Sequence, residues 1–122
     1  MDAIGQHKTV AIMQPTYLPW LGYFDLIGRS DVFVFLDNVQ FAKRSWQQRN
    51  RIKTPHGLEW LTVPVVVSGR YHQRIDEAEI SDPSFADTHI GAIRENYRRA
   101  GAFARHGPGV ADRIRALASA GK

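Results

Sequence analysis

Two short apolar runs with a helix-like segment between them restrict most strongly what this chain can fold into. The first, TVAIMQP, stops at Pro15, and the second, DVFVFLD at residues 31–37, is apolar at every inner position. A helix from near Trp20 to near Gly28 is predicted from apolar residues that recur at steps of three and four: Trp20, Leu21, Phe24 and Ile27. We therefore expect a right-handed βαβ unit in which residues 9–14 and 31–37 are adjacent parallel strands. The second strand should be buried on both faces, and Phe24 should lie in the core.

The rest of the chain predicts one more strand and two helices. Residues 58–67, LEWLTVPVVV, are typical of a strand that is at an edge or bulged, because Pro64 has no N–H for a ladder. Residues 74–80 alternate only loosely and indicate a strand weakly. Asp82 and Pro83 are expected to begin a helix that ends near residues 100–101, and Pro108 is expected to open the last helix.

These elements predict an α/β fold with an open, mainly parallel sheet. Residues 1–122 would form a single domain or the N-terminal part of a longer one, since the predicted sheet is thin and the chain stops after a helix. We accordingly expect an exposed sheet edge or an apolar face that another segment or a partner subunit would cover. The chain lacks cysteine, which excludes thiolate metal sites and disulfides and suits a cytoplasmic location.

Positive charge is concentrated in one segment. The chain has 16 Lys and Arg against 12 Asp and Glu, and five of the cations lie in residues 38–58, which contain no acid. Outside that segment the acids outnumber the cations by one. This pattern favours an anion site over a generally basic surface, although a solvated loop is the plain alternative.

Ligands of open α/β sheets bind outside the carboxyl ends of the strands. Here those ends would be residues 14–17, which lead into the helix near Trp20, and residues 37–40, which lead into the basic segment. We expect Asp37 and Gln40 to orient the reacting groups. The residues expected to bind substrate are Gln14, Tyr17, Trp20, Gly22, Lys43, Arg44, Trp46, Arg49, Asn50 and Arg51. The five histidines share no ligand spacing, so no metal site is predicted, and no particular cofactor is indicated.

The stretch QPTYLPWLGYFDLIGRSDVFVFLDNVQFAKRSWQQRNRIKT, followed by GLEWLTVPV, resembles the WbqC-like family over nearly all of residues 10–67. The resemblance implies a role in bacterial surface-polysaccharide (O-antigen) biosynthesis, with transfer of an acyl or aminoacyl group to a sugar. It also implies a protein about twice this length. The first strands are more distantly similar to pantoate–β-alanine ligases and related nucleotidyltransferases, of the HUP-like fold. Their His-x-Gly-His motif is here Trp20-Leu21-Gly22-Tyr23, which keeps only the glycine and puts adenylylation by histidines in doubt.

Two functions from different classes remain open at this point. The first is a transferase or ligase that binds a small anionic substrate: a nucleotide, a nucleotide-sugar or an acyl phosphate. The second is a nucleic-acid-binding module that uses residues 43–53, where cations alternate with Trp46 and polar amides. The confinement of the cations to one segment makes nucleic acid the weaker expectation. No apolar run approaches the roughly 20 residues that span a bilayer, and a homo-oligomer stays open.

Overall fold

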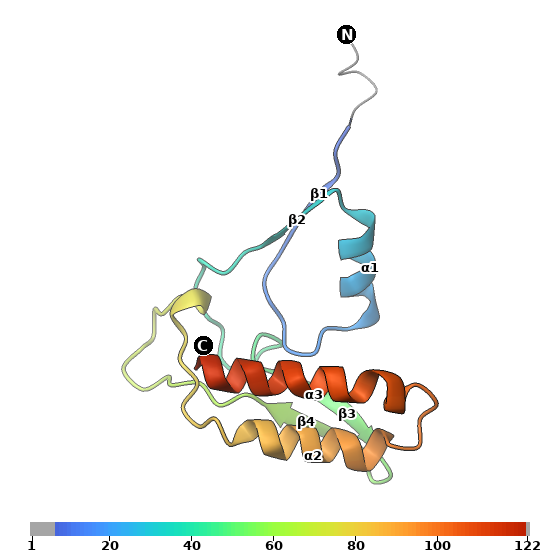
Figure 1. The fold of residues 1–122 in the computed structure, drawn as a ribbon. Helices are drawn as coiled ribbons and strands as arrows, with labels where there is room; N and C mark the ends of the chain where they lie inside the picture. Colours follow the sequence, from blue (N-terminus) through green and yellow to red (C-terminus); the bar gives the residue numbers. More distant parts are fainter. Residues whose placement is uncertain (1–6, 122) are drawn as a thin grey trace.

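The structure, a computed structural model, describes residues 7–121 of the chain. The elements follow in the order β1 (Val10–Met13), α1 (Leu21–Arg29), β2 (Val32–Phe35), β3 (Arg49–Thr54), β4 (Gly57–Thr62), the 3-10 turn η2 (Ile75–Glu77), α2 (Phe85–Tyr97) and α3 (Phe103–Ala120). Figure 1 shows β1, α1 and β2 standing apart from a second layer that contains β3, β4, α2 and α3.

The predicted βαβ unit is confirmed at the N-terminus. β1 and β2 are parallel neighbours in a register that pairs Val10 with Val32 and Ile12 with Val34. α1 connects them and packs Tyr23 against Phe33, with ring centroids 5.5 Å apart. The Tyr23 hydroxyl donates a 2.9 Å hydrogen bond to the Gln14 carbonyl, which ties the helix to the end of β1.

The mixed α/β class and a parallel β1–β2 pair are confirmed, but the described residues do not form the predicted single open, mainly parallel sheet. The described residues form two separate two-stranded sheets, one parallel and one antiparallel. The second is a hairpin in which β3 pairs with β4, so the C-terminal part of the basic segment is a strand that the sequence did not reveal. β4 ends at Thr62 rather than at residue 67, because Pro64 cannot donate to a ladder.

The main hydrophobic core is formed by this hairpin and the two long helices. α2 and α3 pack against each other, and Figure 1 shows them side by side next to the hairpin. The hairpin contributes Ile52 and Leu61 to this core, α2 contributes Ile90, and α3 contributes Ile114. Tyr17, from the turn after β1, is the only core member that precedes the hairpin within residues 7–121. The N-terminal unit is thus joined to the core through that turn rather than through its own strands.

Three local expectations differ from the structure. Residues 74–80 form the turn η2 with isolated bridges instead of a strand. α2 begins at Phe85, preceded by a turn in which the Asp82 carboxylate accepts a hydrogen bond from the Ser84 N–H. Pro108 lies inside α3, which starts at Phe103. Pro108 has no N–H to donate to the Ala104 carbonyl, four residues earlier in the chain. The helix tolerates this loss because Ala104 is exposed, so water can bond to its carbonyl.

The expected burial of β2 on both faces and of Phe24 in the core is wrong. Val34 and Phe35 in β2 are 39% and 55% exposed, and Phe24 in α1 is 55% exposed. The apolar patterns marked faces that could be buried, but residues 7–121 supply no second layer over them. No helix within those residues is long and apolar enough to cross a membrane.

Candidate functional site

The turn that follows β1 is held against the basic segment, as the sequence predicted. The Tyr17 N–H donates a 3.0 Å hydrogen bond to the Trp46 carbonyl, and the Gln47 side-chain amide donates to Gln14 Oε1 over 2.7 Å. Leu18 has a positive φ of 47°, which costs an L-residue roughly 1–2 kcal/mol. The Asn50 amide holds this strained turn by donating to the Leu18 and Tyr17 carbonyls at 2.6 and 3.2 Å. Asn50, expected to bind substrate, is therefore committed to the turn.

The outer face of the hairpin carries the cations. Because side chains alternate along a strand, Arg49, Arg51 and Lys53 share one face of β3, opposite Thr62, Trp60 and Leu58 of β4. Ile52 and Leu61 point the other way, into the core. We call this outer surface, with the adjacent Trp46, the cation–tryptophan face. It contains no carboxylate, since Glu59 is opposite Ile52 on the other side.

The tryptophans of this face organise its arginines. The Arg49 guanidinium lies 4.2 Å from the centre of the Trp60 ring, and that of Arg51 lies 5.2 and 5.7 Å from Trp60 and Trp46. The two indoles are themselves 5.6 Å apart. Each such cation–π contact is worth about 0.5–1 kcal/mol at an exposed site and restricts the guanidinium in space.

The positive charges of the segment are unneutralised. No cation of residues 43–53 is within 4 Å of a carboxylate in the part of the chain that the structure describes. Trp46 and Trp60 remain 49% and 43% exposed. The face can therefore offer a planar, doubly donating guanidinium beside an accessible aromatic ring, a combination that suits phosphate or carboxylate next to a ring system.

A cavity of about 440 Å³ lies at the carboxyl ends of the parallel strands, where the fold rule predicts a site. Pro15, Thr16 and Tyr17 line it from the end of β1, and Asp37 lines it from beyond β2. The charged residues that line it are all acids, Asp37, Asp76 and Glu79. Asp76 and Glu79 are ion-paired with Arg74 and Arg70 at 3.0 and 3.4 Å, but no cation of residues 7–121 lines the cavity itself, so it disfavours a phosphate. The expected juxtaposition of Asp37 with the arginines at one cavity is not present. Within residues 7–121 no three His, Asp or Glu side chains are grouped to hold a metal ion.

Residues 46–49 connect the cavity to the cation–tryptophan face. Gln47 and Gln48 line the cavity, while their neighbours Trp46 and Arg49 contribute to the face. Gln48 is 8% exposed, and its side chain donates to the Val63 carbonyl and accepts from the Arg44 N–H. These bonds fix the connecting segment rigidly to β4 and its continuation. The two surfaces therefore share one short, well-anchored stretch of chain.

Five other predicted site residues lie elsewhere. The Gln40 amide donates to the Tyr71 carbonyl, and Gln40 lines a separate cavity of about 220 Å³ with Lys43. Arg44 is exposed in a turn at a positive φ of 58°. A Cβ on Gly22 would lie 2.4 Å from Nε1 of Trp20. The glycine therefore makes room for that indole, which is 56% exposed.

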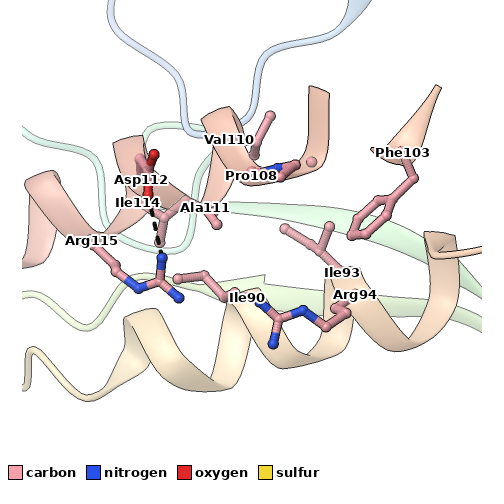
Figure 2. Close-up of a pocket in the computed structure, with 11 residues that line it drawn as sticks. Ile90, Ile93, Arg94, Phe103, Pro108, Val110, Ala111, Asp112, Ile114 and Arg115 are labelled. Atoms are coloured by element: carbon pink, nitrogen blue, oxygen red, sulfur yellow. Dashed lines mark hydrogen bonds and ion pairs between the residues drawn. The ribbon is translucent and has the colours of Figure 1, made fainter. Parts of the chain in front are cut away.

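A buried pair and a helix cleft were missed from the sequence. The Tyr17 hydroxyl and Nδ1 of His89 share a 2.8 Å hydrogen bond, and His89 is 4% exposed. The sequence shows that His89 lies on the apolar stripe of its helix. It gives no sign that the partner of His89 is Tyr17, 72 residues earlier in the chain. Figure 2 shows the second feature, a cleft of about 130 Å³ between α2 and α3, lined by apolar side chains such as Ile90 and Phe103 with Arg94 and Arg115 at its rim. No predicted site residue lines this cleft.

Comparison of the sequence with known proteins places the chain in a family. The model of the family described as "WbqC-like protein family" matches residues 14–119. A curated protein named "Uncharacterized protein Rv1507c", from Mycobacterium tuberculosis (strain ATCC 25618 / H37Rv), is 52% identical over 97 residues. That match covers 80% of this chain and 42% of the relative, so the chain spans about two fifths of the relative's length. No solved structure matches.

Proposed function

The chain belongs to the WbqC-like protein family, and on that premise we propose that it serves bacterial surface-polysaccharide (O-antigen) biosynthesis by binding an anionic activated substrate. The substrate would be a nucleotide, a nucleotide-sugar or an acyl phosphate, used in the cytoplasm for acyl or aminoacyl transfer to a sugar. The observation that carries the proposal is the cation–tryptophan face, on which three cations and no acid share one side of a hairpin. No carboxylate of residues 7–121 forms an ion pair with these cations. The assignment to a transferase or ligase belongs to the same proposal.

The anion is proposed to bind to Arg49 and Arg51. A hydrogen bond to a charged group contributes roughly 1.5–3 kcal/mol, and a guanidinium held against an indole loses little freedom on binding. Trp46 and Trp60 would then contact the ring of a base or sugar attached to the anion. Lys53 adds charge along the same strand, and Lys43 and Arg44 lie on the loop that precedes it.

Asp37 is proposed to act on the other reactant. A cavity lined by carboxylates disfavours a phosphate but accepts hydrogen bonds from the hydroxyls of a sugar or from the ammonium of an aminoacyl group. Asp37 would orient such a group at the ends of the parallel strands, and Gln47 and Gln48 would connect it to the anion-binding face. In the longer proteins of the family, we propose that further strands complete a nucleotidyltransferase-like (HUP-like) sheet around this edge.

Calorimetry on two matched variants tests the anion site. A thermal-shift screen with nucleotides, nucleotide-sugars and acyl phosphates first selects the best ligand. Arg49→Lys keeps the charge but loses both the planar fork and the stacking on Trp60, so the Kd should rise about tenfold or more, the factor that ~1.4 kcal/mol represents. Arg105→Lys, on an exposed position of α3, should leave the Kd unchanged.

Two results would oppose the proposal. An Arg49→Lys variant that binds as tightly as the parent would remove Arg49 from the site. A salt titration addresses the nucleic-acid alternative: a steep dependence of log K on log salt means many phosphates, whereas a slope near one or two means a single small anion. We expect the shallow slope.

A further inference from the structure

One face of the β1–β2 sheet is apolar and open to solvent. The parallel register pairs Val10 with Val32 and Ile12 with Val34, so these four β-branched side chains lie on the same side. Val10 is 55% exposed, Val32 44%, Ile12 58% and Val34 39%. We call this surface the valine–isoleucine face. It is distinct from the hairpin and from both cavities described above.

Helix α1 covers the opposite face of the same sheet in part, since Phe35 on that face stays 55% exposed. Ala11 is 9% exposed, and Tyr23 of α1, 2% exposed, packs against Phe33. Parallel sheets occur almost only with both faces covered, because βαβ crossovers place helices on the faces of the sheet. The valine–isoleucine face thus has the composition of an interior surface, and no part of residues 7–121 covers it.

The area of the face argues against a second copy as its cover. Four half-exposed side chains offer far less than the roughly 800 Å² per partner that a stable interface of ordinary size buries. A helix, in contrast, needs only a stripe of apolar side chains to pack on two strands. More polypeptide than this chain contains exists in the family, since the matched stretch covers only 42% of the mycobacterial relative.

We propose that the valine–isoleucine face is the docking surface for an amphipathic helix from the part of the family protein that lies outside the matched stretch. The helix would bring apolar residues at i, i+3, i+4 and i+7 onto Val10, Ile12, Val32 and Val34, and would keep its polar side toward water. It would complete on this side the layer that α1 forms on the other. The proposal does not depend on the anion site, because none of these four residues belongs to it.

Co-expression tests this docking. A tagged form of the 122-residue chain is produced together with the untagged part of the mycobacterial relative that the match leaves out, and the purified complex is quantified. We expect co-purification in a one-to-one ratio. Val34→Lys should lower the captured amount at least tenfold, because it places a charge in the centre of the contact. Leu21→Lys, on α1 and 87% exposed away from this face, should leave the captured amount unchanged.

A second variant separates docking from folding. Val34→Thr keeps the β-branched shape and the strand propensity but adds a hydroxyl. It should reduce capture while the circular dichroism and thermal melting of the chain stay as in the parent. Capture that survives both Val34 substitutions would overturn the proposal, as would failure of the parent to co-purify. Self-association of the chain that Val34→Lys abolishes would overturn it in favour of a second copy.

Discussion

His89 shows, at the scale of a single residue, how burial can decide protonation. Its ring is enclosed by Tyr17 and by Phe85, whose ring centroid is 5.1 Å away. Loss of hydration lowers the pKa of His89, and a hydrogen bond to the Thr62 backbone opposes this shift only in part. Burial likewise raises the pKa of the Tyr17 hydroxyl far above its ordinary range. Both groups are therefore neutral near pH 7, as a hydrogen-bonded pair in an apolar core requires.

The first prediction concerns pH. Because the folded-state pKa of His89 lies below its unfolded value of about 6.5, the unfolded chain binds more protons between the two values. The free energy of unfolding should be constant above about pH 6.5 and should fall as the pH drops through the lowered pKa. Urea denaturation from pH 7.5 to 5.5 measures this. The difference between the parent and His89→Gln isolates the contribution of this residue, and equal pH slopes in the two proteins would contradict the prediction.

At the scale of elements, the turn after β1 depends on Asn50 of β3. The two carbonyls that Asn50 satisfies belong to Tyr17 and to Leu18, whose backbone is strained. Asn50→Ala should lower the free energy of unfolding by about 1–3 kcal/mol, because it leaves part-buried carbonyls unpaired and releases the strained turn. Asn38→Ala, at an exposed loop position, should change it by no more than about 0.5 kcal/mol. Chemical denaturation compares them, and equal effects would mean that Asn50 does not hold the turn.

At the scale of the whole molecule, stability should be distributed unevenly. The hairpin and the two long helices share one core, whereas β1 and β2 contribute no residue to it. Regions with few buried apolar contacts open with lower free energies than the core does. Hydrogen exchange should therefore be at least about tenfold faster in β1 and β2 than in β3 and β4. Binding of a covering helix to the valine–isoleucine face should slow exchange in β1 and β2 selectively, and equal protection in the free chain would contradict this view.

The sequence by itself determined the elements whose signals are local. Pro15 ended β1, the steps of three and four placed α1, and the apolar run after Asp31 placed β2. The parallel pairing followed from the strand–helix–strand order of these elements. The contact between the turn and the basic segment was also predicted, because both follow strand ends. These conclusions need only periodicity, proline chemistry and connection rules, which act within a few residues of the chain.

The tertiary structure alone decided where the charges and the apolar faces lie. Arg51 is opposite Trp60 only because β3 pairs with β4, and no local signal in the basic segment indicated a strand. Asp37 lines the same cavity as Asp76 and Glu79 because the segment that contains η2 folds back onto the residues after β2, where the Asp76 N–H bonds to the Asp37 carbonyl. The apolar pattern of β2 showed which side chains could be buried, but burial depends on what packs over them. The pattern of apolar and polar side chains is a property of one segment. Which segment covers an apolar face, and which charges lie near one another, depends on segments far apart in the chain. Only the packed structure determines these contacts.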